Sequence, residues 1–297
     1  PMSPGVDPFE CPSDTTLLQI ADLHIVLDGP DSSHPAAWPR ELLSHAREAS
    51  TVRRADARVQ MALPDDRLEP APAPSVRCVH DPVSGGRTIL LRHASLAGVL
   101  MDDRGRYDGR FTPVGTSAAE SLWEVAVRTT VSFLCEDRGY LLLHASAVLH
   151  DDGVWLFAGP SGSGKTTLAT ALGGGGEPLS LDRCLVAFDE HGRAIAHSTP
   201  FSDAGAILTG NLSGPVAGIC FIEQALEHQI HAVTPFEATR KLLQQSLAFS
   251  RDRERLERTM AAAGKLAASG LCLRLRFARD DRFWPLVKRA RRRIQDG

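Results

Sequence analysis

Residues 159–166 read GPSGSGKT, and this stretch decides how the rest of the sequence is interpreted. It matches the pattern G-x-x-x-x-G-K-[ST] at every fixed position. The apolar residues VWLFA at 154–158 precede it and predict a strand buried on both faces. Residues 165–172 follow and predict a helix. Glycines between a strand and a helix let backbone N–H groups converge on an anion, so the stretch predicts a phosphate-binding loop.

The side chains of this loop predict a nucleoside triphosphate with magnesium as the ligand. Lys165 is at the position that reaches the β- and γ-phosphates, and the Thr166 hydroxyl is at the position that coordinates Mg²⁺. A glycine-rich turn that matched by chance would not explain both flanking elements, so we expect ATP and Mg²⁺ as cofactors. The predicted nucleotide-binding residues are Gly159, Ser161, Gly162, Ser163, Gly164, Lys165, Thr166 and Thr167.

Polar residues on two neighbouring predicted strands complete the candidate site. Asp182 should lie where the strand at 179–188 faces the phosphates and could hold Mg²⁺, or it is a structural carboxylate in a turn. Arg183 either neutralises the γ-phosphate or pairs with a neighbouring acid. His144 either lies beside the phosphates or is a structural hydrogen-bonding residue. The candidate catalytic residues are Asp182, His144, Lys165 and Arg183, and the candidate metal ligands are Thr166 and Asp182.

The composition is that of a globular protein and argues against several function classes. Of 297 residues, 43% are hydrophobic and 23% are charged, and the formal net charge is −3. A slightly acidic chain has no basic field to gather nucleic acid or an anionic membrane. No apolar run approaches the roughly 18 residues of a membrane-spanning helix, and no signal peptide is recognised. The six cysteines lack zinc-ligand spacing, so we expect free thiols and a cytoplasmic location.

The chain divides into two predicted domains. Residues 1–116 are expected to form a small β-rich lead-in or accessory domain, with strands at 15–27, 75–80 and 87–92. Residues 117–297 are expected to form a kinase-like catalytic domain around the phosphate-binding loop. Its other predicted elements are a helix at 117–139, a strand at 140–144, mainly helical segments at 237–270 and 281–295, and a strand at 271–277.

Short segments on both sides of the loop resemble the HPr kinase/phosphorylase-like family (HPr serine kinase C-terminal domain). The resemblance covers residues 117–290, and some relatives in this family phosphorylate peptides made by lasso-peptide clusters. The segments that carry it, besides the loop, are HASAV at 144–148, LSLDR at 179–183, STPFS at 198–202 and RLRFARDDRFWPLV at 274–287.

The resemblance implies a fold, an activity and a partner. The fold is α/β, a mixed sheet around a P-loop that is shared with phosphoenolpyruvate carboxykinases. The activity is transfer of the γ-phosphate of ATP to a serine hydroxyl of a peptide or small protein, for example in the tailoring of a ribosomal peptide. The family's histidine, here His144, lies near the phosphates, and its paired acids act as base and metal partner. Because family members form oligomers, a homo-oligomer is a further expectation.

The sequence departs from this family in the acid pair. The family has Asp-Asp, whereas here Leu181 precedes Asp182. Asp182 then covers both roles, or Asp203 or His144 takes one of them. Loss of a general base slows a reaction by roughly two to four orders of magnitude. Two alternatives to a peptide kinase therefore stay open, namely an ATP-binding regulatory protein without transfer activity and a small-molecule hydroxyl kinase.

Overall fold

The computed structural model describes most of the chain. Asp203, the alternative base, lies outside the described residues, and so do the last two residues of the helix predicted at 165–172. No helix within the described ranges has the length and apolar character needed to cross a membrane. The described residues are 16–28, 42, 45–48, 54–63, 65, 67–71, 75–80, 86–93, 95–114, 119–150, 153–170, 176–201, 210–249, 252–278, 280 and 282–295.

The chain forms two compact units, Pro1–Asp137 and Arg138–Gly297. Helix α2 (Ala119–Arg138) therefore belongs almost entirely to the first unit, whereas the sequence-based division at 116/117 placed it in the second. Tyr107 explains this placement, because its ring centroid lies 6.1 Å from that of Phe133 and its hydroxyl donates a hydrogen bond to Asp137. Tyr107 and Phe133 are both buried, so this contact removes apolar surface from water.

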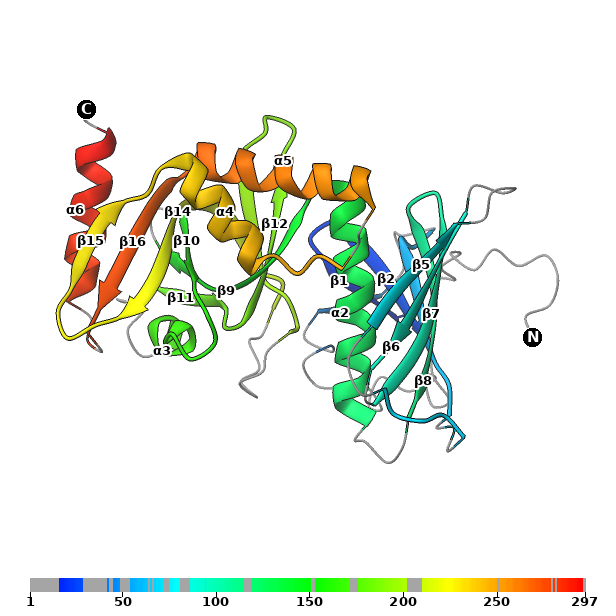
Figure 1. Ribbon diagram of the computed structural model, residues 1–297. Helices are drawn as coiled ribbons and strands as arrows, with labels where there is room; N and C mark the ends of the chain where they lie inside the picture. The colour runs from blue at the N-terminus through cyan, green and yellow to red at the C-terminus, as the bar shows by residue number, and fades with distance from the viewer. Residues whose placement is uncertain are drawn as a thin grey trace. The chain divides into compact units, whose positions relative to one another are not determined.

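The first unit is built on an eight-stranded sheet in the order β3-β1-β2-β4-β8-β7-β6-β5 (Figure 1). Its strands are β1 (Thr16–Ile20), β2 (Leu23–Asp28), β3 (Ala46–Glu48), β4 (Ala57–Met61), β5 (Ser75–His80), β6 (Arg87–Arg92), β7 (Leu96–Asp103) and β8 (Arg106–Pro113). The single strand predicted at 15–27 is the hairpin β1–β2, because the chain turns at Ala21, where φ is +55°. Strands β3, β4, β7 and β8 were not predicted.

The second unit contains a closed five-strand β-barrel and a mixed sheet that extends from it (Figure 1). The barrel strands are β9 (Leu141–His150), β10 (Gly153–Ala158), β12 (Arg183–Phe188), β13 (Ala194–His197) and β14 (Ser213–Gln224). Parallel pairing between β10 and β14 closes the barrel. Strand β11 (Glu177–Ser180) pairs with β9, while β16 (Leu271–Phe277) and β15 (Gln229–Ala232) continue the sheet beyond β14.

Two apolar cores lie on opposite faces of β10. Leu156 and Ala158 belong to one core, together with α4 (Pro235–Gln245) and α5 (Arg253–Ser269). Trp155 and Phe157 belong to the other, together with α3 (Lys165–Thr170) and α6 (Phe283–Gln295). This strand is therefore buried on both faces, which fixes the point where the following loop begins.

The α/β fold class expected from the sequence is wrong. Strands make up 45% of the residues that the structure describes, and a closed barrel with a mixed sheet stands where an α/β phosphate-loop sheet was expected. The physical reason is connectivity. β9 and β10 are antiparallel neighbours, as are β12 and β13, and such pairs need no helical crossover. The fold implied by the HPr kinase resemblance is thus not the one observed.

Candidate functional site

The loop at residues 159–166, which the sequence predicts to bind phosphate, leaves the end of β10 and enters α3. Because β10 is paired with β9 on one side and β14 on the other, the loop starts from a fixed position. At Gly159, an added Cβ would lie 3.0 Å from the Ile222 carbonyl oxygen and 2.8 Å from the Ser163 Oγ. Close packing therefore requires glycine at the first position of the loop.

Two further glycines shape the turn of the loop. Gly162 and Gly164 have φ angles of +76° and +98°, a region that side chains disfavour. An added Cβ at Gly164 would also lie 2.8 Å from Cζ of Phe277. Between these glycines, the Ser163 amide donates a 3.2 Å hydrogen bond to the Pro160 carbonyl oxygen. Glycine is therefore required at Gly159 by close packing, at Gly162 by positive φ, and at Gly164 by both.

Lys165 begins α3, and its side chain is enclosed by the loop. Its Nζ donates hydrogen bonds to the carbonyl oxygens of Gly159 at 2.9 Å and Pro160 at 3.0 Å. The residue is only 6% exposed. Ser146 Oγ donates to the Lys165 carbonyl oxygen at 2.9 Å, which ties β9 to the start of the helix. The loop therefore presents a buried ammonium group where the sequence pattern predicts contact with phosphates.

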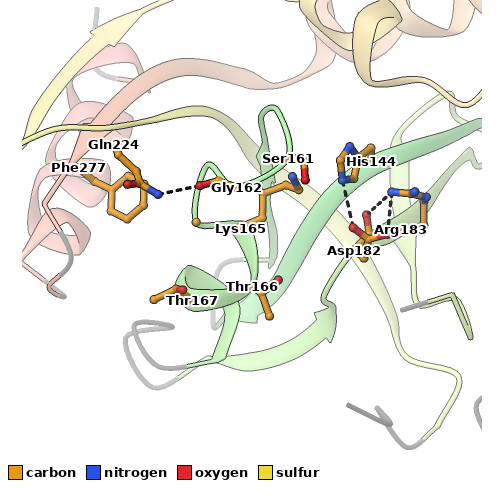
Figure 2. A pocket seen from close by; sticks show the side chains of 11 residues that line it. His144, Ser161, Gly162, Lys165, Thr166, Thr167, Asp182, Arg183, Gln224 and Phe277 are labelled. Atoms are coloured by element: carbon orange, nitrogen blue, oxygen red, sulfur yellow. Dashed lines mark hydrogen bonds and ion pairs between the residues drawn. The ribbon is translucent and has the colours of Figure 1, made fainter. Parts of the chain in front are cut away.

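Asp182 lies between β11 and β12 and contacts two basic side chains. Its Oδ1 is 3.1 Å from His144 Nε2, and its Oδ2 is 2.7 Å from Arg183 Nη1. The antiparallel register of β9 and β12 places His144 opposite Arg183, so strand pairing brings the group together. Figure 2 shows these three side chains meeting beside the loop.

The surroundings of Asp182 keep its carboxyl group ionised. Burial alone would raise its pKa. The hydrogen bond from His144 and the positive charges of Arg183, His144 and Lys165 together have the larger effect, so the pKa of Asp182 lies below its ordinary value. An ionised carboxylate beside the predicted phosphate-binding loop is suited to hold a divalent cation.

The backbone at Arg183 is held by two buried hydroxyl groups. Thr199 Oγ1 donates a 2.6 Å hydrogen bond to the Arg183 carbonyl oxygen, and Ser180 Oγ donates to the same oxygen. Ser180 belongs to the LSLDR segment and Thr199 to the STPFS segment. The structure therefore brings together two segments that the sequence analysis singled out separately.

Leu181 occupies the position where an acid was expected, and its side chain lies in an apolar core. It is 1% exposed and shares a core with Phe157, Leu168 and Trp284. A carboxylate buried there without a cationic partner would be strongly destabilising. The segment between β11 and β12 thus directs Asp182, and not residue 181, toward the site.

A cavity of about 610 Å³ joins the loop to the Asp182 group (Figure 2). Its lining residues are His144, Ser161, Gly162, Gly164, Lys165, Thr166, Thr167, Asp182, Arg183, Gln224 and Phe277. All of these except the last two were candidates from the sequence. Gly159 and Ser163 were also candidates, but they do not line the cavity, because they are buried against each other.

Gln224 and Phe277 are the two lining residues that sequence reasoning missed. They end β14 and β16 and are register partners on parallel strands. Since β14 also runs parallel to β10, all three strands end at the edge of the sheet that carries the loop. Ligands commonly bind beyond the carboxyl ends of parallel strands, so recognition of β14 would have pointed to both residues.

Residues 118–290 match a family model described as "SynChlorMet cassette protein ScmC". The match spans more than half of the chain and includes every residue that lines the cavity. This chain belongs to the ScmC family. A comparison with curated proteins gave no significant match. The description of the ScmC family states no activity, so the function has to be argued from the site.

The cavity of this ScmC-family protein carries the groups that a triphosphate with a divalent cation would contact. Lys165, Arg183 and His144 supply basic groups, while Asp182 is the single carboxylate among the lining residues. Within the described ranges, no group of three or more His, Cys, Asp or Glu could hold a metal by itself. Mg²⁺ commonly takes one or two protein ligands and completes its shell with phosphate oxygens and water. Thr166 and Asp182 would hold it in this way.

We expect Gly164→Ala to distort the loop of this ScmC-family protein. The new methyl group would meet the Phe277 ring, and the backbone would be strained at φ +98°. The free energy of unfolding should fall by about 1–3 kcal/mol. Gly264→Ala is the matched control, because this α5 position has open space and alanine should stabilise the helix by ~0.5–1 kcal/mol. Urea unfolding of both variants tests this, and equal stability of the two would contradict it.

The Asp182 interactions should stabilise the fold only above acidic pH. Because the folded pKa lies below the unfolded one, this contribution is fully present above about pH 4 and is lost as pH falls through the folded pKa. The difference in unfolding free energy between the natural protein and Asp182→Asn should therefore be constant from about pH 7 to pH 4 and should shrink as the pH falls below about 4. Urea unfolding over this range tests it, and a constant difference would show that Asp182 has the same pKa in both states.

Proposed function

We propose that this protein binds ATP with Mg²⁺ in the cavity and transfers the γ-phosphate to a hydroxyl group of a peptide or small protein. One observation carries the proposal, namely that Lys165 and Thr166 of the loop line the same cavity as the ionised Asp182. A loop that only reversed the chain would need neither a buried lysine nor this carboxylate group beside it. The activity is the one implied by the HPr kinase resemblance, although the implied fold is not observed.

Binding would use groups that already surround the loop. The Lys165 ammonium would exchange its contacts with two carbonyl oxygens for charge-assisted hydrogen bonds to phosphate oxygens. Arg183 and His144 add basic groups on the other side of the cavity. When bound, Mg²⁺ would neutralise charge on the phosphates, with the Thr166 hydroxyl and the Asp182 carboxylate as its protein ligands.

The transfer step would depend mainly on orientation. The acceptor hydroxyl oxygen forms a bond to the γ-phosphorus, the bond to the β–γ bridging oxygen breaks, and ADP leaves. The hydroxyl proton passes to the Asp182 carboxylate. Phosphoryl transfer has a loose transition state in which positioning matters more than base strength, so a carboxylate with a lowered pKa is adequate. Arg183 would stabilise the negative charge of the transferred group.

A second candidate function is ATP binding without transfer, and the position of Leu181 favours it. Because this residue lies in the core, Asp182 is the one carboxylate that lines the described cavity, and it already contacts His144 and Arg183. A regulatory protein that responds to nucleotide needs only the loop and the metal ligands. This candidate predicts saturable ATP binding with no phosphorylated product.

A single-turnover assay distinguishes the two functions. The protein is placed in excess over γ-³²P-labelled ATP with Mg²⁺ and a pool of serine-containing synthetic peptides. The proposal predicts a labelled peptide, the gain of one phosphate by mass spectrometry, and loss of both signals when EDTA removes Mg²⁺. Saturable binding without labelling supports the regulatory function, and absence of binding contradicts both.

The proposal extends to a cytoplasmic location, and the cysteines support it. Cys135, Cys184, Cys220 and Cys272 are buried thiols and form no disulfides. Burial raises the pKa of Cys184 to about 12 and that of Cys272 to about 11. Such thiols are unreactive and belong to the packing of the protein.

A further inference from the structure

Gln224 contacts the turn of the phosphate-binding loop from a distant part of the chain. Its Nε2 donates a 2.8 Å hydrogen bond to the carbonyl oxygen of Gly162. Gly162 has a φ of +76°, and an added Cβ there would meet no atom within 4 Å, so packing around that position does not hold the turn. Figure 2 shows the Gln224 amide reaching the loop beside Phe277.

Phe277 supports the same loop at a second point. Its ring is 1% exposed, and its Cζ occupies the space that a Cβ at Gly164 would need. Gln224 and Phe277 are register partners at the ends of β14 and β16. The Ala225 amide donates a 2.9 Å hydrogen bond to the Phe277 carbonyl oxygen and continues this pairing past the strand end. Gln224 thus makes a polar contact and Phe277 an apolar contact with the loop, and the pairing of β14 with β16 holds the two residues beside each other.

We propose that Gln224 is a positioning residue that holds the loop turn in its phosphate-binding conformation, and that Phe277 supports the same loop by apolar contact at Gly164. We call these two contacts, from Gln224 and from Phe277, the brace. The inference rests on the proposed function, since it names how the nucleotide site is kept in shape. Gln224 is exposed, so its hydrogen bond competes with water and adds little to overall stability. Its effect should therefore be local to the loop and visible in nucleotide affinity.

Two variants of Gln224 test the brace against a matched control. Gln224→Ala removes the donor, and Gln224→Glu keeps the length but directs a carboxylate toward a carbonyl oxygen. ATP Kd should rise about three- to tenfold for Gln224→Ala and further for Gln224→Glu, with the melting temperature unchanged. Gln244→Ala, at an exposed position on α4, should alter neither Kd nor melting temperature.

A second measurement on the nucleotide-free protein is independent of ATP binding. The Ser163 amide, which donates to Pro160 within the turn, should exchange its hydrogen several times faster in Gln224→Ala. Amides of α5 should exchange as in the natural protein. Unchanged hydrogen exchange at Ser163 would contradict the proposed role of Gln224 even if the protein binds ATP. Faster exchange in a protein that binds no ATP would support the positioning role of Gln224 and contradict the proposed function.

Discussion

Replacing Lys165 with alanine is expected to weaken ATP binding by about a hundredfold to ten-thousandfold. The side chain is enclosed by the loop, and Lys165 lines the cavity where the phosphates would lie. Two charge-assisted hydrogen bonds would be lost, at about 1.5–3 kcal/mol each. Equilibrium titration with a fluorescent ATP analogue measures this change, and phosphate transfer should disappear with it.

The control for this variant is Lys288→Ala, at an exposed position on α6 outside the cavity lining. It should bind ATP as the natural protein does. Lys165→Ala also removes hydrogen bonds to two loop carbonyl oxygens, so circular dichroism and melting temperature are needed to show that it remains folded. A folded Lys165→Ala protein with unchanged ATP affinity would contradict the proposed role of the loop.

Replacing Asp182 with asparagine is expected to slow phosphate transfer by roughly two to four orders of magnitude. The substitution keeps the shape but removes the negative charge that contacts His144 and Arg183 and that would hold Mg²⁺ and receive the hydroxyl proton. ATP binding should weaken far less than in Lys165→Ala, because the loop is untouched. Single-turnover labelling measures transfer, and equilibrium titration measures binding on the same sample.

Asp103→Asn is the matched control for this acid, since Asp103 is an exposed carboxylate at the end of β7. Its transfer rate should equal that of the natural protein. If Asp182→Asn labels an acceptor at the rate of the natural protein, Asp182 has no part in transfer. If neither the natural protein nor Asp182→Asn labels any acceptor, while both of them bind ATP, the regulatory function is the better account.

The local parts of the site could be predicted from the sequence, because short-range chemistry determines them. Eight consecutive residues specify the loop, and the structure explains its glycines at 159, 162 and 164 by close packing and positive φ. The carboxylate of Asp182 was placed near the loop from its position in the next strand, and it lines the same cavity as Lys165. The part of His144 and Arg183 in catalysis stays a prediction.

The closure of the barrel could not be predicted, because it depends on a strand whose sequence resembles a loop. Residues 213–224 read SGPVAGICFIEQ, with glycine and proline at positions that disfavour a strand. The structure shows why Gly218 is there: an added Cβ would lie 2.5 Å from the ring of Trp155 on the neighbouring strand. This contact joins residues more than sixty positions apart, so local propensity gives no sign of it. Without β14, neither the fold class nor Gln224 could be identified.

The most direct test of the central claim is calorimetric titration of the purified protein with ATP in the presence of Mg²⁺. The proposed function predicts saturable binding at one site per chain, weakened when EDTA removes the metal and lost in Lys165→Ala. Absence of saturable binding at millimolar ATP, in a protein shown to be folded, would contradict the claim that this loop is a nucleotide site.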